Sequence, residues 1–366
     1  MTHILEVNKF YAPHIGGIET LVQQRAEYFA QQPDTEVRVL VCQDHRGRAE
    51  HKRINGADVY FCSSLGTYFS CPVSLEFFRK FKEMADWADV AEIHTPFPLG
   101  DAACLVSKCG CRVVIAWHSD VIKQKLLLQC YKPILRRFLK RADAIITATR
   151  GHIDGSAFLP EFRDKCRIIP YPLDASRYEA AARRAILQCR DAKSVKVLFV
   201  GRLVYYKGAE YLIEAFRQVH GCELFICGTG KLEAELKARA RGLPVHFLGR
   251  LSDADLKAAF ADCDFFVLPS VERSEAFGIV QQEAMVYGKP VINTALRSGV
   301  PYVSEHGKTG LTVPPKDAGA LARAIQRLAD DAALRAEYGR NAAEKVRREY
   351  APDRIMKQIR DVLEGR

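Results

Sequence analysis

The chain has 366 residues, 48% of them hydrophobic, and a formal net charge of +10 at pH 7. This length suits two domains that each bury a core, and no apolar run reaches the roughly 18 residues that a membrane span needs. Its twelve cysteines come close only in Cys109-Gly110-Cys111, which excludes zinc-finger spacing and a Cys-x-x-Cys motif. The first residues resemble a strand rather than a signal peptide, so we expect a cytoplasmic protein with reduced thiols.

The first half of the chain alternates short apolar runs with helix-length segments. After a strand at residues 3–7, a loop containing Gly16 and Gly17 opens a helix that runs to about Phe29. The two glycines let backbone N–H groups approach a ligand closely. Further strands are expected at 37–42, 59–62, 90–94, 113–117, 144–149 and 167–170, with helices at 74–86 and 120–141. The alternation predicts a parallel sheet with both faces covered.

His118 follows the apolar run 113–117 and precedes Ser119-Asp120, which we expect to cap the next helix. A histidine at the carboxyl end of a parallel strand lies where such sheets bind ligands. The alternative is a structural histidine whose hydrogen bonds are satisfied in the core.

Residues 123–141 form a basic amphipathic segment. Seven Lys or Arg side chains alternate there with leucines and aromatic residues, and no acid is present. The segment can lie on an anionic membrane surface, or it can pack its apolar side on the core and expose a solvated basic side. Nucleic acid is not expected as a partner, because no nucleic-acid-binding motif accompanies the charge.

The prolines at 170 and 172 interrupt regular structure, and we place the domain boundary after residue 173. A second series of strands follows at 195–200, 223–227, 245–248, 265–268 and 291–293, with helices at 208–219, 231–241, 253–261, 278–287, 317–328, 331–349 and 353–364. The predicted fold class is α/β. Two Rossmann-like, doubly wound domains, 1–173 and 174–351, face a central cleft at the carboxyl ends of their strands.

The loop after the first strand of the second domain runs from Gly201 to Gly208 and carries Arg202 and Lys207, five residues apart. Arginine binds phosphate through a planar fork and lysine as a point charge. The spacing therefore predicts a clamp for a diphosphate, unless both are plain surface cations. The loop is not a P-loop, because the Gly-x-x-x-x-Gly-Lys-Ser/Thr pattern is absent.

Glu275 and Glu283 stand eight positions apart on either side of Gly278. If a helix begins near Gly278, Glu275 lies in the preceding loop and Glu283 lies inside the helix, at most roughly 12 Å away. That separation suits the two ends of one extended ligand better than one metal ion. The helix N-terminus between them favours phosphate. The alternative is a surface helix with two solvated acids.

Taken together, these motifs resemble the retaining glycosyltransferases of family 4, which have the GT-B fold. The resemblance rests on Gly16-Gly17, His118-Ser119-Asp120, Gly201-Arg202 with Lys207-Gly208, and Glu275-Ala276-Phe277-Gly278 ending in Glu283. It covers nearly the whole chain. Within the family, the chain is most similar to bacterial O-antigen mannosyl- and rhamnosyltransferases.

The resemblance implies a role for each of these residues. Arg202, Lys207, Glu275 and His118 would be the catalytic group: the cations hold the donor diphosphate, Glu275 binds sugar hydroxyls and His118 positions the sugar. The donor-binding residues would be Gly16, Gly17, Gly201, Phe277, Gly278 and Glu283, the last on the ribose. Neither glutamate need be an acid, base or nucleophile, and no metal or other cofactor is implied. The C-terminal helix, 352–366, would complete the first domain.

The function that the resemblance implies is transfer of a hexose, mannose-like and from GDP-mannose, to a lipid-linked saccharide at the inner face of the plasma membrane. The partners would be the nucleotide-sugar donor, the lipid-linked acceptor and, through 123–141, the membrane surface. A UDP-sugar transferase for glucose, galactose or GlcNAc is the nearest alternative, and a nucleotide-sugar epimerase is a more distant one. A non-catalytic nucleotide-sugar-binding partner of an assembly complex is the alternative from another class.

Overall fold

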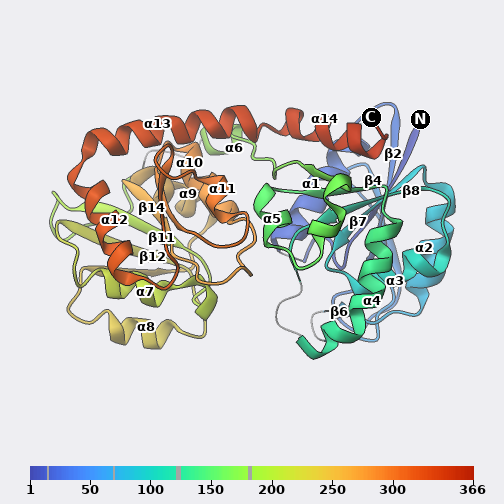
Figure 1. The fold of residues 1–366 in the computed structure, drawn as a ribbon, viewed down its shortest axis with the longest axis horizontal. Coiled ribbons are helices and arrows are strands. Elements are labelled where there is room, and N and C mark those ends of the chain that lie inside the picture. Colours follow the sequence, from blue (N-terminus) through green and yellow to red (C-terminus); the bar gives the residue numbers. More distant parts are fainter. Residues whose placement is uncertain (15, 69–70, 121–124, 180–183) are drawn as a thin grey trace. The chain divides into compact units, whose positions relative to one another are not determined.

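A computed structural model describes residues 1–366 except 15, 69–70, 121–124 and 180–183, and of 125–128 and 179 the backbone alone. The chain divides into two compact units (Figure 1). The first comprises Met1–Ala148, Ser156–Ile169 and Met356–Arg366, and the second comprises Thr149–Gly155 and Pro170–Ile355. The boundary thus falls after Ile169 rather than after residue 173. Thr149–Gly155, which we expected in the first domain, belongs to the second unit.

The first unit is built on an eight-stranded sheet in the order β10-β9-β8-β7-β1-β2-β4-β3. Its strands are β1 (Thr2–Val7), β2 (Thr35–Cys42), β3 (Glu50–Ile54), β4 (Ala57–Cys62), β7 (Val90–Thr95), β8 (Arg112–Trp117), β9 (Ala144–Thr147) and β10 (Cys166–Ile168). All neighbours are parallel except β3, which pairs antiparallel with β4. The short pair β5 (Thr67–Tyr68) and β6 (Cys71–Pro72) forms a separate ribbon.

Helices α1 (Gly17–Ala30), α2 (Glu76–Trp87), α3 (Pro98–Ser107) and α4 (Lys125–Arg141), with the 3-10 helix η1 (Leu159–Lys165), surround this sheet. The last helix, α14 (Pro352–Leu363), joins the first unit from Met356 onward. An ion pair between Arg360 and Asp34 holds it there. Arg112 Nε also donates a hydrogen bond to the Val362 carbonyl oxygen at 3.2 Å.

The predicted start of α4 after Ser119-Asp120 falls on 121–124, outside the described residues. The described part of α4 begins at Lys125. The Asp120 carboxylate accepts hydrogen bonds from Ser156 Oγ (2.7 Å) and Ala157 N (2.8 Å). The carboxylate therefore satisfies the start of the η1 segment, where unpaired N–H groups also need acceptors.

The second unit contains a six-stranded parallel sheet in the order β13-β12-β11-β14-β15-β16. Its strands are β11 (Val195–Val200), β12 (Cys222–Cys227), β13 (Val245–Gly249), β14 (Phe265–Leu268), β15 (Val291–Thr294) and β16 (Gly310–Val313). Its helices are α5 (Arg150–Gly155), α6 (Ser176–Glu179), η2 (Tyr205–Lys207), α7 (Ala209–Ala215), α8 (Glu233–Arg239), α9 (Asp253–Asp262), α10 (Ile279–Val286), α11 (Val300–Val303), α12 (Ala318–Asp330), α13 (Ala332–Glu349) and the first residues of α14.

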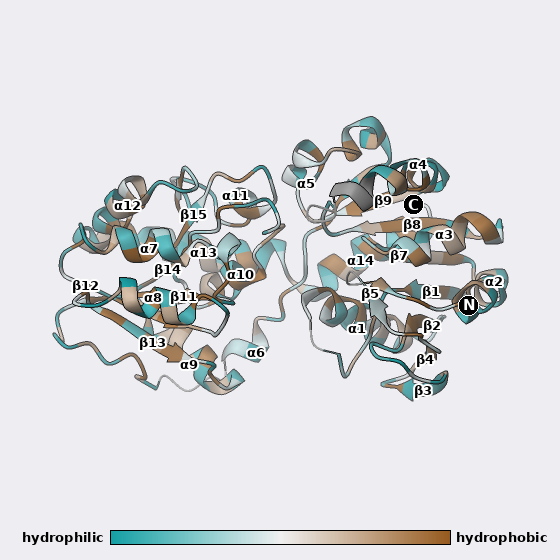
Figure 2. Cartoon of the chain, turned by 90° about the horizontal axis from the view of Figure 1, so that it is seen from below, coloured by the Kyte–Doolittle hydropathy of each residue, from teal (hydrophilic) through white to brown (hydrophobic). Residues whose placement is uncertain are grey.

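In both units most strands are apolar, whereas the helices carry both apolar and hydrophilic residues (Figure 2). The strand side chains Phe199, Ile226 and Val267 are fully buried in the core of the second unit. Burial of such side chains is the main favourable term in folding. The predicted class, two Rossmann-like α/β domains, is confirmed.

Each sheet has a strand from which the chain order runs in opposite directions. In the second sheet β11 lies between β12 and β14, and in the first β1 lies between β2 and β7. The loops that follow two such neighbouring strands diverge to opposite faces and leave room for a ligand at the carboxyl edge. The loops after β11 and β14 are the ones that carry the predicted cations and glutamates.

None of the described helices has the length and apolar character that crossing a membrane requires. α4 packs its apolar side against the first unit, since Leu135, Phe138 and Leu139 are buried. Arg136 and Arg137 are exposed. The basic segment thus has a solvated basic side over the described part of its length, and residues 123–124 lie outside the described residues.

Asp101 on α3 is fully buried, and its carboxylate accepts a hydrogen bond from the Tyr131 hydroxyl of α4. Burial raises the pKa of Asp101 from 3.8 to about 8. A carboxyl group whose pKa is higher in the folded state than in the unfolded state stabilises the fold at low pH. This contribution to the unfolding free energy is lost as pH rises through the pKa of the folded state. We expect the first unit to lose about 2 kcal/mol between about pH 6.5 and pH 8.5 through this group, and Asp101→Asn to abolish that part of the loss.

Both tryptophans, Trp87 and Trp117, belong to the first unit, so tryptophan fluorescence during guanidinium unfolding reports on that unit. Wild type and Asp101→Asn should be compared at the two pH values. Parallel pH dependences of the unfolding free energy in the two proteins would contradict the expectation.

Candidate active site

The loop after β11 places two cations on either side of Tyr206. Arg202 Nη2 donates a hydrogen bond to the Tyr206 hydroxyl at 2.8 Å, and Lys207 Nζ lies 5.7 Å from the centre of the Tyr206 ring. The loop turns through η2 and ends at Gly208, whose φ of 69° is left-handed. The two predicted cations therefore belong to one short, structured loop.

The loop after β14 brings a carboxylate to the second of these cations. Glu275 Oε2 lies 2.5 Å from Lys207 Nζ and accepts a hydrogen bond from Ser270 Oγ at 3.1 Å. Glu275 is only 8% exposed. The sequence predicted both groups for the donor site but not their direct contact.

The two loops approach so closely that a side chain does not fit between them. A Cβ atom added to Gly208 would lie 2.0 Å from the Pro269 carbonyl oxygen. Next to this contact, the Val271 N–H donates to the Tyr206 carbonyl oxygen at 2.9 Å. The glycine thus permits the backbone contact that sets Lys207 opposite Glu275.

The start of α10 is fixed by a buried amide network. Gly278 precedes the helix with a φ of 74° and offers no side-chain cap. Gln281 Nε2 donates to the Phe277 carbonyl oxygen at 3.0 Å, and Gln281 Oε1 accepts from Asn293 Nδ2 at 2.9 Å. As predicted, Glu275 lies in the loop before this helix and Glu283 lies within it.

Glu283 has a different environment from Glu275. Its Oε1 accepts a hydrogen bond from the Tyr178 hydroxyl at 3.2 Å. Burial raises the pKa of Glu283, and burial next to Glu283 raises that of Tyr178. The carboxylate therefore has a neutral phenol as its direct partner, whereas Glu275 has a cation.

Gly16, Gly17 and His118 belong to the first unit. Gly16 precedes α1 with extended backbone and no side-chain cap. His118 follows β8, is 4% exposed, and its Nε2 lies 3.0 Å from Nδ1 of His94. The predicted site residues thus fall into two groups, and Gly201, Arg202, Lys207, Glu275, Phe277, Gly278 and Glu283 form the group in the second unit.

Family models match both halves of the chain: Glycosyltransferase Family 4 over residues 15–177 and Glycosyl transferases group 1 over residues 188–345. The O-antigen chain mannosyltransferase C of Escherichia coli is 31% identical over 96% of this chain and 95% of its own. The chain belongs to glycosyltransferase family 4. The D-rhamnosyltransferase WbpZ of Pseudomonas aeruginosa is 38% identical over 75% of this chain and 73% of its own.

The fold of this family 4 glycosyltransferase is found in solved structures as well. The sucrose-phosphate synthase of Thermosynechococcus elongatus superposes with a TM-score of 0.80 at 21% identity, covering 100% of this chain and 99% of that one. The Anabaena HepE structure in complex with UDP gives 0.76 at 19% identity, with both chains covered completely. The predicted family, GT-B fold and enzyme class, a glycosyltransferase of the hexosyltransferase type, are confirmed.

Sequence reasoning missed three polar residues of this glycosyltransferase that lie close to the predicted ones. Ser270 follows the end of strand β14, and Tyr206 lies in the loop that carries Arg202 and Lys207. These positions could have indicated both residues from the sequence. His152 on α5 had no such indication, because it lies in a polar stretch that we assigned to the other domain. It is buried, its Nδ1 lies 2.9 Å from Thr149 Oγ1, and its ring lies 6.5 Å from that of Phe277.

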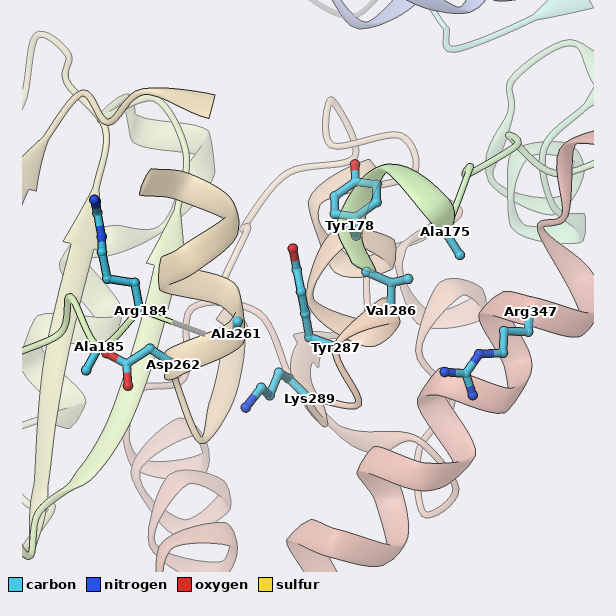
Figure 3. A pocket seen from close by; sticks show the side chains of 10 residues that line it. All are labelled: Ala175, Tyr178, Arg184, Ala185, Ala261, Asp262, Val286, Tyr287, Lys289 and Arg347. Carbon is cyan, nitrogen blue, oxygen red and sulfur yellow. The ribbon is translucent and has the colours of Figure 1, made fainter. Parts of the chain in front are cut away.

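A pocket of about 580 Å³ in the second unit is lined by Tyr178, the partner of Glu283, but by none of Arg202, Lys207 and Glu275 (Figure 3). Its wall includes the last residues of α9 and of α10, whereas Gly278 directly precedes the first turn of α10 and Glu275 lies in the loop before it. Its lining residues are Ala175, Tyr178, Arg184, Ala185, Ala261, Asp262, Val286, Tyr287, Lys289 and Arg347. We therefore do not assign the donor to this pocket.

The close approach at Gly208 can be separated from ordinary backbone strain. Gly242 also has a left-handed φ, of 79°, but a Cβ there meets nothing within 4 Å. We expect Gly242→Ala to cost about 1–2 kcal/mol of unfolding free energy, and Gly208→Ala to cost clearly more because Pro269 must also move. Urea unfolding followed by far-UV circular dichroism measures both; equal losses would show that the contact between the loops is unimportant.

Proposed function

We propose that this enzyme is a retaining, metal-independent hexosyltransferase that moves a mannose-like sugar from GDP-mannose to a lipid-linked saccharide during cell-surface polysaccharide assembly. Support for the sugar and the process comes from the relatives, which are an O-antigen chain mannosyltransferase and a D-rhamnosyltransferase. Support for the chemistry comes from the side chains at the carboxyl edge of the second sheet.

The observation that carries the proposal is the group formed by Arg202, Lys207 and Glu275. A lysine ammonium has three donors, so Lys207 can keep its contact with Glu275 and still donate to a phosphate oxygen. Arg202 has a neutral hydroxyl as its partner and can turn its planar fork to the same diphosphate. The cations would stabilise the charge that develops on the leaving nucleoside diphosphate, which makes a metal ion unnecessary.

The remaining residues would orient the donor. Glu275 would accept hydrogen bonds from sugar hydroxyls, with the N–H groups near Phe277 and Gly278 beside the phosphate. Glu283 would bind the ribose hydroxyls, exchanging the Tyr178 hydroxyl for them. In the first unit, His118 would position the sugar ring and Gly16-Gly17 would allow a close backbone approach to the donor. Gly201 would do the same after β11.

Retention of configuration follows from attack on the face that the diphosphate leaves. The bond between the anomeric carbon and the diphosphate oxygen breaks, and the acceptor oxygen bonds to the same face of that carbon. The acceptor proton passes to the departing diphosphate. No carboxylate needs to act as nucleophile in this scheme, which agrees with the engagement of Glu275 by Lys207 and Ser270.

A donor panel tests the proposal against its alternatives. The protein is incubated with GDP-mannose, UDP-glucose and UDP-GlcNAc together with a lipid-linked saccharide extract, and nucleotide release is measured with and without EDTA. We expect release from GDP-mannose, unaffected by EDTA. Release from a UDP-sugar alone would make it a UDP-sugar transferase, and binding without turnover of any donor would favour a non-catalytic partner.

Lys207→Ala should lower turnover about tenfold or more, equivalent to about 1.4 kcal/mol of transition-state stabilisation. The matched control is Lys237→Ala, which removes an exposed lysine paired with Glu233 on α8 of the same unit. Turnover of the control should equal that of wild type. Unchanged turnover in Lys207→Ala would eliminate the diphosphate clamp.

We further propose that the enzyme is cytoplasmic and binds the inner face of the membrane peripherally through the exposed basic side of α4. Arg136→Glu combined with Arg137→Glu should weaken sedimentation with anionic liposomes, because each arginine near an anionic surface contributes about 1 kcal/mol. Arg347→Glu with Arg348→Glu, an exposed pair on α13, is the matched control. Equal binding of both double variants would leave α4 as a helix with a merely solvated basic side.

A further inference from the structure

Three buried side chains form a hydrogen-bonded chain at the carboxyl edge of the first sheet. The distance between Oε2 of Glu6 on β1 and Nε2 of His94 on β7 is 2.8 Å. The distance between Nδ1 of His94 and Nε2 of His118 is 3.0 Å. Glu6 and His94 are 0% and 1% exposed. The two imidazole rings are nearly parallel, with an interplanar angle of 9°. The predicted sugar-positioning histidine thus belongs to a hydrogen-bonded chain that begins inside the core.

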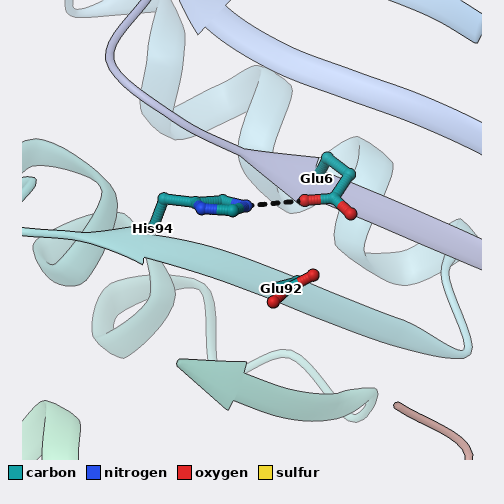
Figure 4. Close-up of side chains that lie close together, drawn as sticks. All are labelled: Glu6, Glu92 and His94. Carbon is teal, nitrogen blue, oxygen red and sulfur yellow. Dashed lines mark hydrogen bonds and ion pairs between the residues drawn. The ribbon is translucent and has the colours of Figure 1, made fainter. Parts of the chain in front are cut away.

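A second carboxylate lies beside this chain. Glu92 on β7 points to the same place as Glu6 and His94 (Figure 4), and it forms an ion pair with the buried guanidinium of Arg25 on α1. One guanidinium therefore faces two buried carboxyl groups. Burying an uncompensated charge is costly, so the cluster favours one additional proton. Glu6 and Glu92 also interact directly with each other. We place the proton on Glu6 Oε2, the oxygen that faces His94, because Glu92 already has the direct cationic partner.

This additional proton fixes the hydrogen-bond direction along the whole chain. If Glu6 is protonated, its O–H donates to His94 Nε2, and His94 Nδ1–H donates to His118 Nε2. If the proton sits on His94 instead, both nitrogens of His94 donate, and His118 Nε2 again accepts. In either state a neutral His118 carries its own proton on Nδ1.

Loss of this proton reverses every bond. The Glu6 carboxylate then accepts from His94 Nε2–H, and His94 Nδ1 accepts from His118 Nε2–H. His118 Nδ1 changes from a donor to an acceptor. Which tautomer a histidine adopts is set by the bond that its other nitrogen makes.

We propose that Glu6 and His94 are positioning residues that set the tautomer of His118, so that His118 Nδ1 is a hydrogen-bond donor while the cluster of Glu6, Glu92, His94 and Arg25 holds one extra proton. This inference rests on the proposed role of His118 at the sugar. It assigns a use to buried polar residues that the reaction scheme otherwise leaves without one.

The same cluster is a poor metal site. The carboxylates and His94 present three ligand atoms within 4.8 Å of one another, but Arg25 already contacts Glu92. A divalent cation would compete with the guanidinium for the same carboxylate. A proton satisfies the charge balance without displacing Arg25.

The charged groups around the chain place its titration near neutral pH. Burial raises the pKa of Glu6 and that of Glu92 to about 7, against the attraction of Arg25. Burial lowers the pKa of His94 to about 3. Glu19 on α1 and the Tyr11 hydroxyl also interact with the cluster. We therefore expect His118 Nδ1 to donate below about pH 7 and to accept above it.

The test uses the full chain labelled with ¹⁵N-histidine, without substrate. Long-range proton–nitrogen spectra distinguish the two tautomers, and loss of one signal in His118→Gln assigns His118 among the ten histidines. In wild type the Nδ1–H form should give way to the Nε2–H form as pH rises through about 7. Glu6→Gln should keep the Nδ1–H form throughout, because its amide N–H donates to His94 and does not titrate.

The matched control is Glu223→Gln. Glu223 bonds Nε2 of His246 at 2.6 Å in the second unit and has no link to His118. It should leave the His118 spectrum and the pH dependence of kcat unchanged. His94→Asn, checked for folding by tryptophan fluorescence, provides a second break in the chain, after which the His118 tautomer should no longer follow Glu6.

With GDP-mannose as the donor, Glu6→Gln should flatten the pH dependence of kcat between about pH 6 and pH 8 while the donor KM changes less than about twofold. A His118 tautomer that titrates identically in wild type and Glu6→Gln would overturn the inference, as would an unchanged kcat profile. Absence of turnover in wild type with the tautomer change still present would refute the proposed function and leave the coupling of Glu6 to His118 standing.

Discussion

The contact between Lys207 and Glu275 depends on the hydrogen bonding of β11 to β14. These two strands are neighbours in the sheet although an αβαβα stretch separates them in the chain, and their following loops therefore meet at the carboxyl edge. Gly208 permits the loops to touch, and Ser270 supplies the second bond to the carboxylate. A cation and an acid are thereby held in place before any ligand arrives, which is the condition under which electrostatic stabilisation requires little reorganisation.

The two units treat buried charge in opposite ways. In the second unit Glu275 has a lysine at contact distance, although Glu283 has only a phenol as its direct partner. In the first unit Glu6, Glu92 and Asp101 are all fully buried, and Arg25 is the direct cationic partner of Glu92 alone. The first arrangement keeps fixed charges in a fixed geometry, while the second holds protons whose number changes near neutral pH. One chain thus combines a rigid electrostatic site with a titrating interior.

The sequence was sufficient for the strand and helix order because continuous apolar runs such as 113–117 and 265–268 have few alternatives to a buried parallel strand. It failed where the partner is distant in the chain. It gave no sign that the Asp120 carboxylate accepts hydrogen bonds from residues 156 and 157. β3 was missed because its residues are charged and mostly exposed at the sheet edge, so no apolar pattern marks it.

The candidate site shows the same division. The placement of Arg202, Lys207 and Glu275 in loops, and of Glu283 in the helix after Gly278, could be predicted because glycines and strand ends mark these segments. The Glu6–His94 chain was missed. The sequence does indicate buried acids, because one glutamate stands inside Ile4-Leu5-Glu6-Val7 and another inside Val90-Ala91-Glu92-Ile93. A carboxylate in a strand that is otherwise apolar must have a buried partner, but which partner it has depends on sheet order.

The chain passes between its two units four times, after Ala148, Gly155, Ile169 and Ile355. No single cut therefore yields two complete modules. A hybrid enzyme that takes only residues 174–351 from a relative would combine the foreign half with the native Thr149–Gly155 segment, whose Gly151 and Gly155 pack against the backbone of Ser298 and Arg297. An exchange of complete units would therefore have to move 149–155 together with the second unit and keep the end of α14 with the first. Such an exchange needs four junctions rather than one.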